Sequence, residues 1–164
     1  MKQEYLRYDY NIPTSDITQA LRNLINNYPK LSANDEIKFA TTDSDSGIAM
    51  YPSAGVGVIS EKNDISGWCE QLCGYEFLVV YKASGLTENR RAKVKEWLDD
   101  LGRWLNKQDV DGYKLDKYPT LEKGKEFKII SIMSPSHIRD TRDNKTEMWG
   151  IALRAIYTNE FNRD

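Results

Sequence analysis

Few side chains in this 164-residue chain are of types that carry out chemistry, and their spacing does not fit a known active site. His137 is the only histidine, and it stands beside Ser136 in a short stretch rich in Ser and Pro. A hydrolytic triad needs a third group that orients the histidine, and the local sequence offers none. We therefore expect a histidine in a polar loop. The alternative from another functional class is a small acyltransferase-like enzyme that uses His137 as its base.

Cys69 and Cys73 are the only cysteines, and they are spaced as C-x3-C. A zinc site needs four ligands, usually from two close pairs, and redox enzymes use C-x-x-C. Because both cysteines flank the start of an apolar segment, we expect buried structural thiols and no bound metal. Two cysteines make no disulfide framework, so a reducing compartment such as a cytoplasm is favoured.

Two further patterns are weak as functional signals. The Gly-Val-Gly-Val run at 55–58 resembles the opening of a dinucleotide fingerprint, but it lacks the third glycine and does not lead into a helix. Two carboxylate pairs are expected in a turn and on a solvated helix face, namely Asp43 with Asp45 and Asp99 with Asp100. The sequence therefore predicts no catalytic residue, no cofactor and no metal site, and we expect a protein that is not an enzyme.

Composition limits the functional classes. A hydrophobic content of 40% with 29% charged residues is typical of a folded globular chain. The formal charge of −2 argues against direct nucleic-acid binding, which draws on a positive surplus. No apolar run approaches the roughly 18 residues of a membrane span, and the N-terminus resembles no secretory signal, so we expect no membrane partner.

Charge is unevenly distributed along the chain. Residues 30–70 carry a net charge of −4, and residues 82–154 carry a net charge of +4. The simpler interpretation is chance variation on a solvated surface. The alternative is a pair of complementary faces, which a head-to-tail oligomer would use to orient its subunits.

The strongest structural pattern is a strand–turn–helix unit from Gly74 to Lys107. Residues 75–81 are apolar on both faces, which predicts an interior strand, and Thr87 is suited to cap the following helix. That helix has an apolar stripe. Trp97 and Trp104 lie on one border of the stripe, where they either complete the core or act as partly exposed anchors in a subunit contact.

The remaining segments predict one α+β domain over residues 1–164. We expect a mostly antiparallel or mixed β-sheet flanked by two main helices, at about 14–28 and 87–107, with a long C-terminal β-hairpin. Residues 36–61 are expected to form a meander of short antiparallel strands. Residues 1–12 alternate like a strand, and they predict either an edge strand or an extended arm.

The C-terminal hairpin is expected to end in an extended polar connection, from Ser134 to Thr146. Alternating charges occupy it, and long loops of this kind often carry binding residues. The candidate assembly contacts in this connection are Arg139, Asp140, Arg142 and Asp143.

Six stretches in order along the chain resemble one known family. They are 47–52, 61–67, 73–85, 90–104, 143–145 and 157–161. Together they are similar to the tail terminator (minor capsid) proteins of tailed bacteriophages and of phage-tail-like bacteriocins of Gram-positive bacteria. The similarity covers most of the chain and involves no chemically diagnostic motif.

The resemblance implies a structural protein of a virion or phage-tail-like particle that is made in the bacterial cytoplasm. Such a protein forms a hexameric ring that caps the head-proximal end of the tail tube, stops tube polymerisation and joins the tail to the next component. The implied partners are other copies of the chain, the tail tube protein, and a sheath or head–tail connector protein. A different head–tail joining protein is the close alternative.

Overall fold

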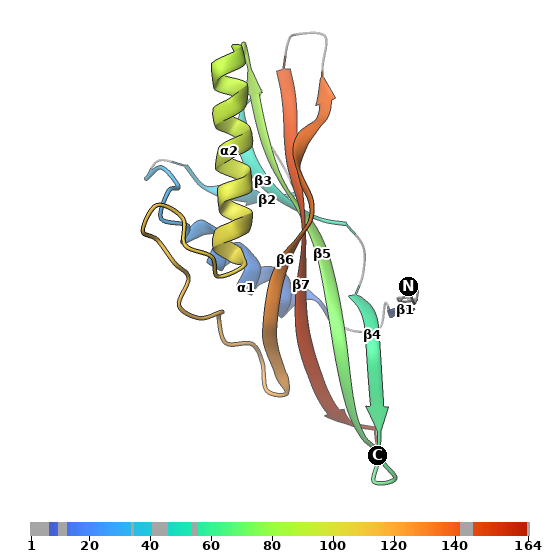
Figure 1. The fold of residues 1–164 in the computed structure, drawn as a ribbon. Coiled ribbons are helices and arrows are strands. Elements are labelled where there is room, and N and C mark those ends of the chain that lie inside the picture. The colour runs from blue at the N-terminus through green and yellow to red at the C-terminus, as the bar shows by residue number, and fades with distance from the viewer. Residues whose placement is uncertain are drawn as a thin grey trace, which may run out of the picture.

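The computed structural model describes residues 7–9, 13–33, 35–40, 46–53, 56–141 and 146–163. In these ranges, seven strands form one mixed β-sheet, and two helices pack on one of its faces (Figure 1). The expected α+β class is therefore confirmed. The helices are α1 (Ser15–Asn26) and α2 (Glu88–Leu105). The strands are β1 (Arg7–Asp9), β2 (Ile37–Phe39), β3 (Gly47–Pro52), β4 (Val56–Asn63), β5 (Trp68–Ser84), β6 (Lys125–Thr141) and β7 (Thr146–Asn162).

Strand β5 is the centre of the sheet. It pairs antiparallel with β7 along its whole length, from Trp68 opposite Asn162 to Ser84 opposite Thr146. Its other edge is divided, because β4 pairs with residues 69–74 and β3 pairs with residues 77–82. The prediction of an interior strand is confirmed, and the strand is longer than its apolar run.

The antiparallel meander expected for residues 36–61 is wrong in its connections. Strand β2 runs parallel to β3, and β3 and β4 both pair with β5 rather than with each other. A 17-residue central strand has room for two shorter partners on one edge, so each of them can pair with β5. At the N-terminus, β1 lies antiparallel beside β4 as an edge strand, and residues 1–6 and 10–12 lie outside the described residues.

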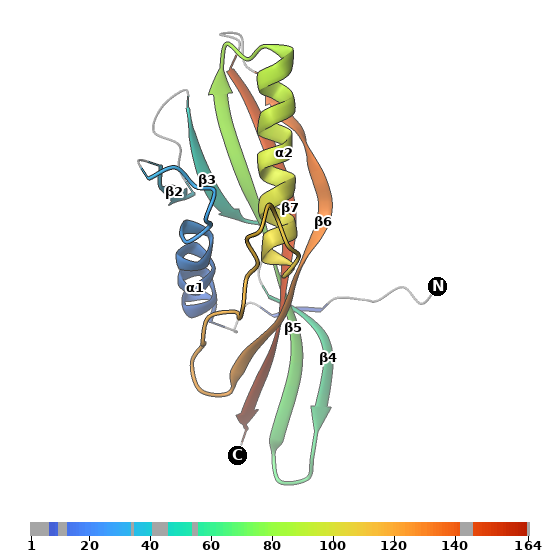
Figure 2. The same ribbon diagram turned by 60° about the vertical axis from the view of Figure 1, so that its left-hand side comes forward.

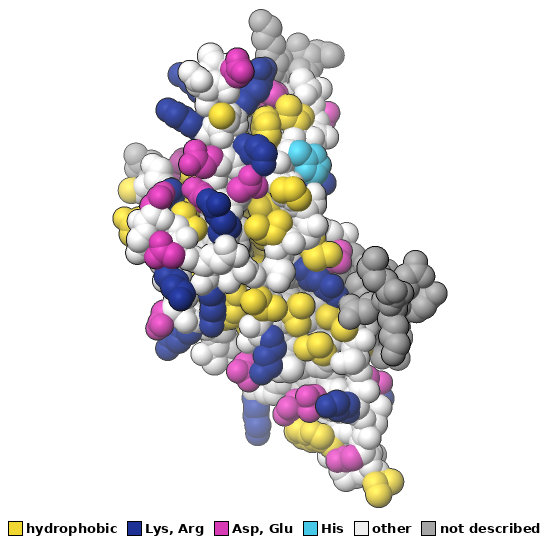
Figure 3. Space-filling model, viewed as in Figure 1, with side chains coloured by type: hydrophobic (Ala, Val, Ile, Leu, Met, Phe, Trp, Pro, Cys, Tyr) yellow, Lys and Arg dark blue, Asp and Glu magenta, His cyan; other side chains and the backbone are white. Residues whose placement is uncertain are grey.

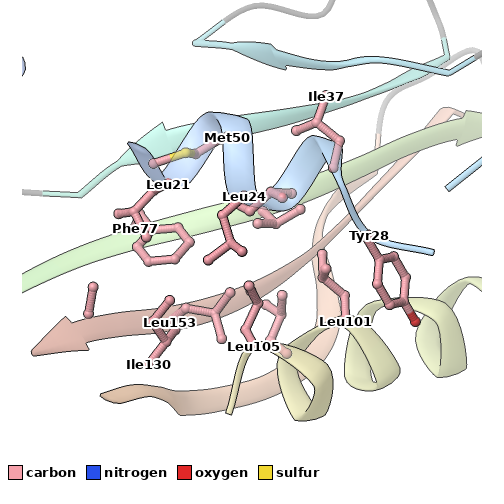
Figure 4. Close-up of a cluster of buried hydrophobic side chains, with 14 of the residues drawn as sticks. Leu21, Leu24, Tyr28, Ile37, Met50, Phe77, Leu101, Leu105, Ile130 and Leu153 are labelled. Atoms are coloured by element: carbon pink, nitrogen blue, oxygen red, sulfur yellow. The ribbon is translucent and has the colours of Figure 1, made fainter. Parts of the chain in front are cut away.

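The hydrophobic core lies between the helices and the sheet. Alternate residues of β5 point into it, and Tyr75, Phe77 and Val79 are each at most 1% exposed. Figure 4 shows side chains of α1, α2, β5, β6 and β7 meeting in this space. The buried positions on the helices follow the predicted helical spacing. They are Ile17, Leu21, Leu24 and Ile25 on α1, and Val94, Leu98, Leu101, Trp104 and Leu105 on α2.

Helix α2 begins where its capping residue predicts. The Thr87 hydroxyl accepts the backbone N–H of Arg90 at 3.4 Å, which occupies one of the N–H groups that the first turn leaves without an intrahelical partner. At the other end, the side chain of Asn106 donates to the carbonyl of Ile130 at 2.8 Å. These contacts fix the helix against β6 at its C-terminal end.

The molecule is elongated along β5 and β7. One end holds the start of α2 and the β6–β7 hairpin, and the other end is the β4–β5 turn (Figures 1 and 2). Near the turn, parts of β4, β5 and β7 extend beyond both helices. We call this projecting part, residues 58–72 with 157–163, the arm.

Candidate interaction surface

His137 does not lie in a loop, as the sequence predicts, because β6 continues through Thr141. The expected polar connection from Ser134 is therefore wrong at its start. Charged, exposed side chains and Pro135 are typical of loops, but an edge strand accepts both where bulges interrupt its pairing. The register between β6 and β7 shifts between Ser134 and His137.

His137 and Ser136 make contacts that do not link them to each other. The Ser136 side chain is 2% exposed, and its hydroxyl donates to a carboxylate oxygen of Asp99 at 2.6 Å. His137 is exposed, and its Nδ1 lies 3.0 Å from the carbonyl oxygen of Pro135. A hydroxyl that is already committed to a carboxylate in the core is poorly placed as a nucleophile for an external substrate.

The two cysteines are buried and form no disulfide with each other, so the expectation that both thiols are buried is confirmed. The Sγ of Cys69 lies 3.4 Å from a carboxylate oxygen of Glu61. Among the residues that the structure describes, no group of three or more His, Cys, Asp or Glu side chains could hold a metal ion. Asp43, Asp45 and Gly55 lie outside the described residues.

The two tryptophans of α2 have different surroundings. Trp104 is 4% exposed, and its ring lies 5.2 Å from that of Tyr28, so it belongs to the core of the subunit rather than to its surface. Trp97 is half-buried and packs edge-on against Tyr28 and Tyr81, with 5.6 Å between ring centroids in each case. Of the two, only Trp97 keeps an accessible edge.

Asp99 and Asp100 are not simply solvated, as the sequence suggests. Asp100 is 3% exposed, and it contacts both Lys30 and Arg103, the latter at a spacing of three residues. Asp99 and Arg103 are four residues apart on the helix, a spacing that allows an ion pair. The Asp99 carboxylate instead contacts Lys95, at 2.7 Å. Both acids tie α2 to other parts of the fold.

Asp99 holds β6 against α2. Its carboxylate accepts the backbone N–H of Ser136 at 2.9 Å as well as the Ser136 hydroxyl. Partial burial by itself would raise the pKa of Asp99, but the hydrogen bonds from Lys95 and Ser136 hold that pKa below its ordinary value of 3.8. The ionised carboxylate is therefore the form that binds the bulge of β6.

Strand β6 exposes four large apolar side chains, which are between 36% and 50% exposed: Ile129, Ile132, Met133 and Ile138. By register, Ile132 and Ile138 lie on the face of the sheet that carries the helices and Ile129 on the other face, and we call the exposed apolar edge that the four form the β6 surface. Figure 3 shows hydrophobic side chains following β6 beside a helix whose exposed side is mainly charged. Large apolar residues that gather on one exposed strand mark a contact surface more often than single exposed ones do.

The outer edge of β6 is partly occupied by side chains from its own subunit. The N–H of Ile130 donates to the Tyr118 hydroxyl at 3.1 Å, and the carbonyl of Ile130 accepts from Asn106. Farther along, the N–H of Ser136 is bound by Asp99. At these points a neighbour cannot add a strand through backbone hydrogen bonds, so side chains are what β6 offers to a partner.

The four charged candidates of the hairpin fall into two groups. Arg139 and Asp140 are exposed on β6, and the aliphatic part of Arg139 lies over Gly150 of the neighbouring strand. Arg142 and Asp143 lie outside the described residues. The structure thus places Arg139 and Asp140 directly after Ile138, at the end of the β6 surface.

A hydrogen-bond network stiffens the arm. The side-chain amide of Gln71 donates to Glu61 at 2.8 Å, and that of Asn159 donates to Gln71 at 3.2 Å, which links three adjacent strands. Arg163 adds an ion pair with Glu61 at 2.9 Å. Gln71 is 1% exposed, so the network supplies hydrogen-bond partners to a polar side chain that is buried in the sheet.

Glu61 should make the arm sensitive to acid. The hydrogen bond from Gln71, against an opposing effect of burial, lowers the pKa of Glu61 from 4.5 to about 2. Its stabilising contribution is therefore complete above pH 4.5 and is lost as the pH falls toward 2. We expect Glu61→Gln to lower the free energy of unfolding by about 1 kcal/mol at pH 6 and to cost almost nothing near pH 2.

Urea unfolding of both proteins between pH 2 and 6 measures this difference. Glu126→Gln is the control, since Glu126 is exposed and its contact with Lys128 lies on the surface. If the difference in free energy of unfolding between wild type and Glu61→Gln stayed constant with pH, the ionised Glu61 would not stabilise the arm through this network.

Sequence reasoning missed the apolar residues of β6 and the tip of the arm. The run Ile-Ile-Ser-Ile-Met at 129–133 was a usable signal, because an edge strand needs apolar residues on only one face. Ile65 was a second signal, since it stands among turn residues with nothing local to pack against. Neither signal could be interpreted before β6 was known to be an edge strand and the turn to be a projecting end.

Comparison with models of known protein families finds no match, and comparison with curated proteins finds none either. Within the described part of the chain, no helix is both long and apolar enough to cross a membrane. The function must therefore be argued from the surfaces described above and from the resemblance in the sequence.

Proposed function

We propose that this chain is a structural assembly protein of a phage or phage-like tail, which forms a closed, six-membered ring on the head-proximal end of the tail tube and stops its growth. The observation that carries the proposal is the β6 surface, an edge of exposed apolar side chains beside the exposed Arg139 and Asp140. A purely monomeric protein gains nothing from such an edge, whereas a subunit contact buries it.

The mechanism requires shape rather than chemistry. One surface of the ring must bind the last tube subunits as a further layer of tube would. The opposite surface must not bind any further tube subunit. A ring of heterologous contacts closes when its rotation closes, so that no filament grows from it. The bound side chains along the β6 edge fit this role, because they hinder an open-ended addition of strands.

The partners follow from this role. They are other copies of the chain, the tail tube protein, and a sheath or connector protein on the side that faces the head. The role requires no catalytic residue, metal or cofactor, and it needs no contact with nucleic acid or membrane. The tail of a virion or phage-tail-like particle is then the site of action.

The test is tube capping by wild-type protein and by Met133→Asp/Ile138→Asp. Tube subunits are polymerised with each protein, and negative-stain microscopy gives the length distribution of the tubes and the density at their ends. We expect wild type to shorten tubes and cap one end with a ring. The double variant should lose at least 90% of the capped ends, because each carboxylate would have to be desolvated in the contact.

Tyr113→Asp is the matched control, since Tyr113 is 48% exposed, lies in the segment between α2 and β6 and does not belong to the β6 surface. It should cap as wild type does. Unchanged tube length and bare ends with the wild-type protein would overturn the terminator function. Normal capping by Met133→Asp/Ile138→Asp would show that the β6 surface is not needed for capping.

A further inference from the structure

The turn between β4 and β5 presents an apolar side chain at the far end of the arm. Ile65 is fully exposed, and Trp68 beside it is 42% exposed. A large apolar side chain at the tip of a projecting hairpin makes no packing contribution to its own subunit. It is placed as an anchor for the surface of another molecule.

The turn that carries Ile65 is held in a defined conformation. One carboxylate oxygen of Asp64 accepts the N–H of Ser66 at 2.9 Å, the N–H of Trp68 at 3.0 Å and the Ser66 hydroxyl at 2.6 Å. The N–H of Arg163 donates to the carbonyl of Gly67 at 2.9 Å, which fastens the turn to the end of the chain. An anchor that is ordered before binding loses little conformational entropy when it docks.

The opposite end of the molecule has a pocket of about 420 Å³. Leu86 and Ile138 form apolar parts of its wall, so it is continuous with the upper end of the β6 surface. Arg91 and Glu147 also line it, and the Arg91 Nε lies 2.9 and 3.1 Å from the two carboxylate oxygens. Because these two charges compensate each other, they do not prevent an aliphatic side chain from entering.

The two ends also differ in charge. The stretch 61–70, around the tip, contains three carboxylates and one lysine. The stretch 88–95, at the start of α2 beside the pocket, contains four basic side chains and one carboxylate. These two stretches lie toward opposite ends of the elongated subunit, where Arg163 pairs with Glu61 at the tip and Glu147 pairs with Arg91 at the pocket. Such complementarity orients two copies head to tail.

We infer that Ile65 of one copy docks in the pocket of a second copy, between Leu86 and Ile138. Tip and pocket lie at opposite ends, so the contact is heterologous, and repeating it around an axis generates a ring. The inference rests on the proposed ring and deepens it by naming the two surfaces that meet. In this arrangement the arm of one subunit lies toward the β6 surface of the next.

Site-directed cross-linking tests the contact directly. Ile65→Cys protein is mixed with Leu86→Cys protein, alone and in the presence of polymerising tubes, and disulfide formation is followed on non-reducing gels. We expect a cross-linked heterodimer, because the two thiols would face each other in the contact. The control is a mixture of Ile65→Cys protein with Tyr113→Cys protein, which should give at least tenfold less cross-linked heterodimer. The native cysteines Cys69 and Cys73 are buried, so the introduced thiols are the ones expected to react.

A second measurement uses Ile65→Asp and sedimentation or light scattering over a range of concentrations. We expect its association to weaken at least tenfold relative to wild type, with the thermal transition unchanged, since Ile65 has no packing contacts to lose. Wild-type rings together with normal assembly of Ile65→Asp and no cross-link would overturn this contact and leave the ring proposal standing. A wild type that neither self-associates nor caps tubes would overturn both.

Discussion

Replacing Gly124 with alanine is expected to lower the free energy of unfolding by about 3 kcal/mol or more. Gly124 has a φ of +88°, which an L side chain adopts only with strain. A Cβ added there would lie 2.4 Å from the backbone carbonyl oxygen of Glu160, and backbone cannot move aside as a flexible side chain can. The same two residues are joined by the N–H of Glu160, which donates to the Gly124 carbonyl at 2.7 Å. Chemical unfolding of both proteins measures the loss.

Gly112→Ala separates the two causes of this expected loss. Gly112 has nearly the same φ, +86°, but nothing lies within 4 Å of an added Cβ. We expect it to cost only about 1 kcal/mol, the contribution of the backbone strain. If both variants lost the same stability, the close approach of Gly124 to β7 would not be a real constraint.

Asp99→Ala is expected to lower the free energy of unfolding by about 2 kcal/mol. The substitution leaves the buried N–H of Ser136 without its acceptor, and such a group is costly to bury unpaired. The Ser136 hydroxyl loses its bond to Asp99 and keeps only the carbonyl of Lys95, at 3.1 Å, so the bulge of β6 is held less firmly against α2. We therefore expect weaker ring assembly in addition, although Asp99 does not belong to the β6 surface. Denaturant unfolding and tube capping measure the two effects.

The contribution of Asp99 should depend on pH in a defined direction. Its pKa is lowered in the folded chain, so its stabilisation is present above the ordinary value of 3.8 and is lost as the pH falls through the lower, folded value. The difference between wild type and Asp99→Ala should accordingly shrink in acid. Lys95→Ala is the control and should cost under about 1 kcal/mol, because Lys95 is 47% exposed. If Lys95→Ala lost as much stability as Asp99→Ala, the stabilisation by Asp99 would come from its ion pair with Lys95 instead of its hydrogen bonds to Ser136.

The local elements were largely predictable, because each one repeats a simple pattern. The stripe on α2 and the capping Thr87 gave that helix within two residues, and the apolar run 75–81 gave the interior strand. These patterns depend on which side chains must face a core, and a contiguous stretch of sequence records that requirement directly.

Pairing between distant segments was not predictable in the same way. Nothing local states that β2 runs parallel to β3, or that β3 and β4 divide one edge of β5. The bulges of β6 are a similar case, since they depend on Asp99 of α2 reaching Ser136 across 37 positions of sequence. Such contacts are decided by which segments lie close together after folding.

The candidate contact residues show the same division. Sequence spacing placed Trp97 and Trp104 equally at the border of a helix stripe, but the packed chain buries Trp104 and leaves Trp97 half-buried. Ile65 and Ile138 cannot be recognised as contact residues from the sequence alone. They become candidates only because the fold puts one at a projecting tip and the other beside a pocket at the opposite end.

By itself, the sequence determined the α+β class, the interior strand, both helices and the buried thiols, because composition and periodicity carry that information. Tertiary structure alone decided the edge position of β6, the exposure of its apolar side chains, the arm, and the placement of the tip and the pocket at opposite ends. The physical reason is that exposure and distance between surfaces are properties of the packed chain, since they depend on which surfaces the other segments leave uncovered.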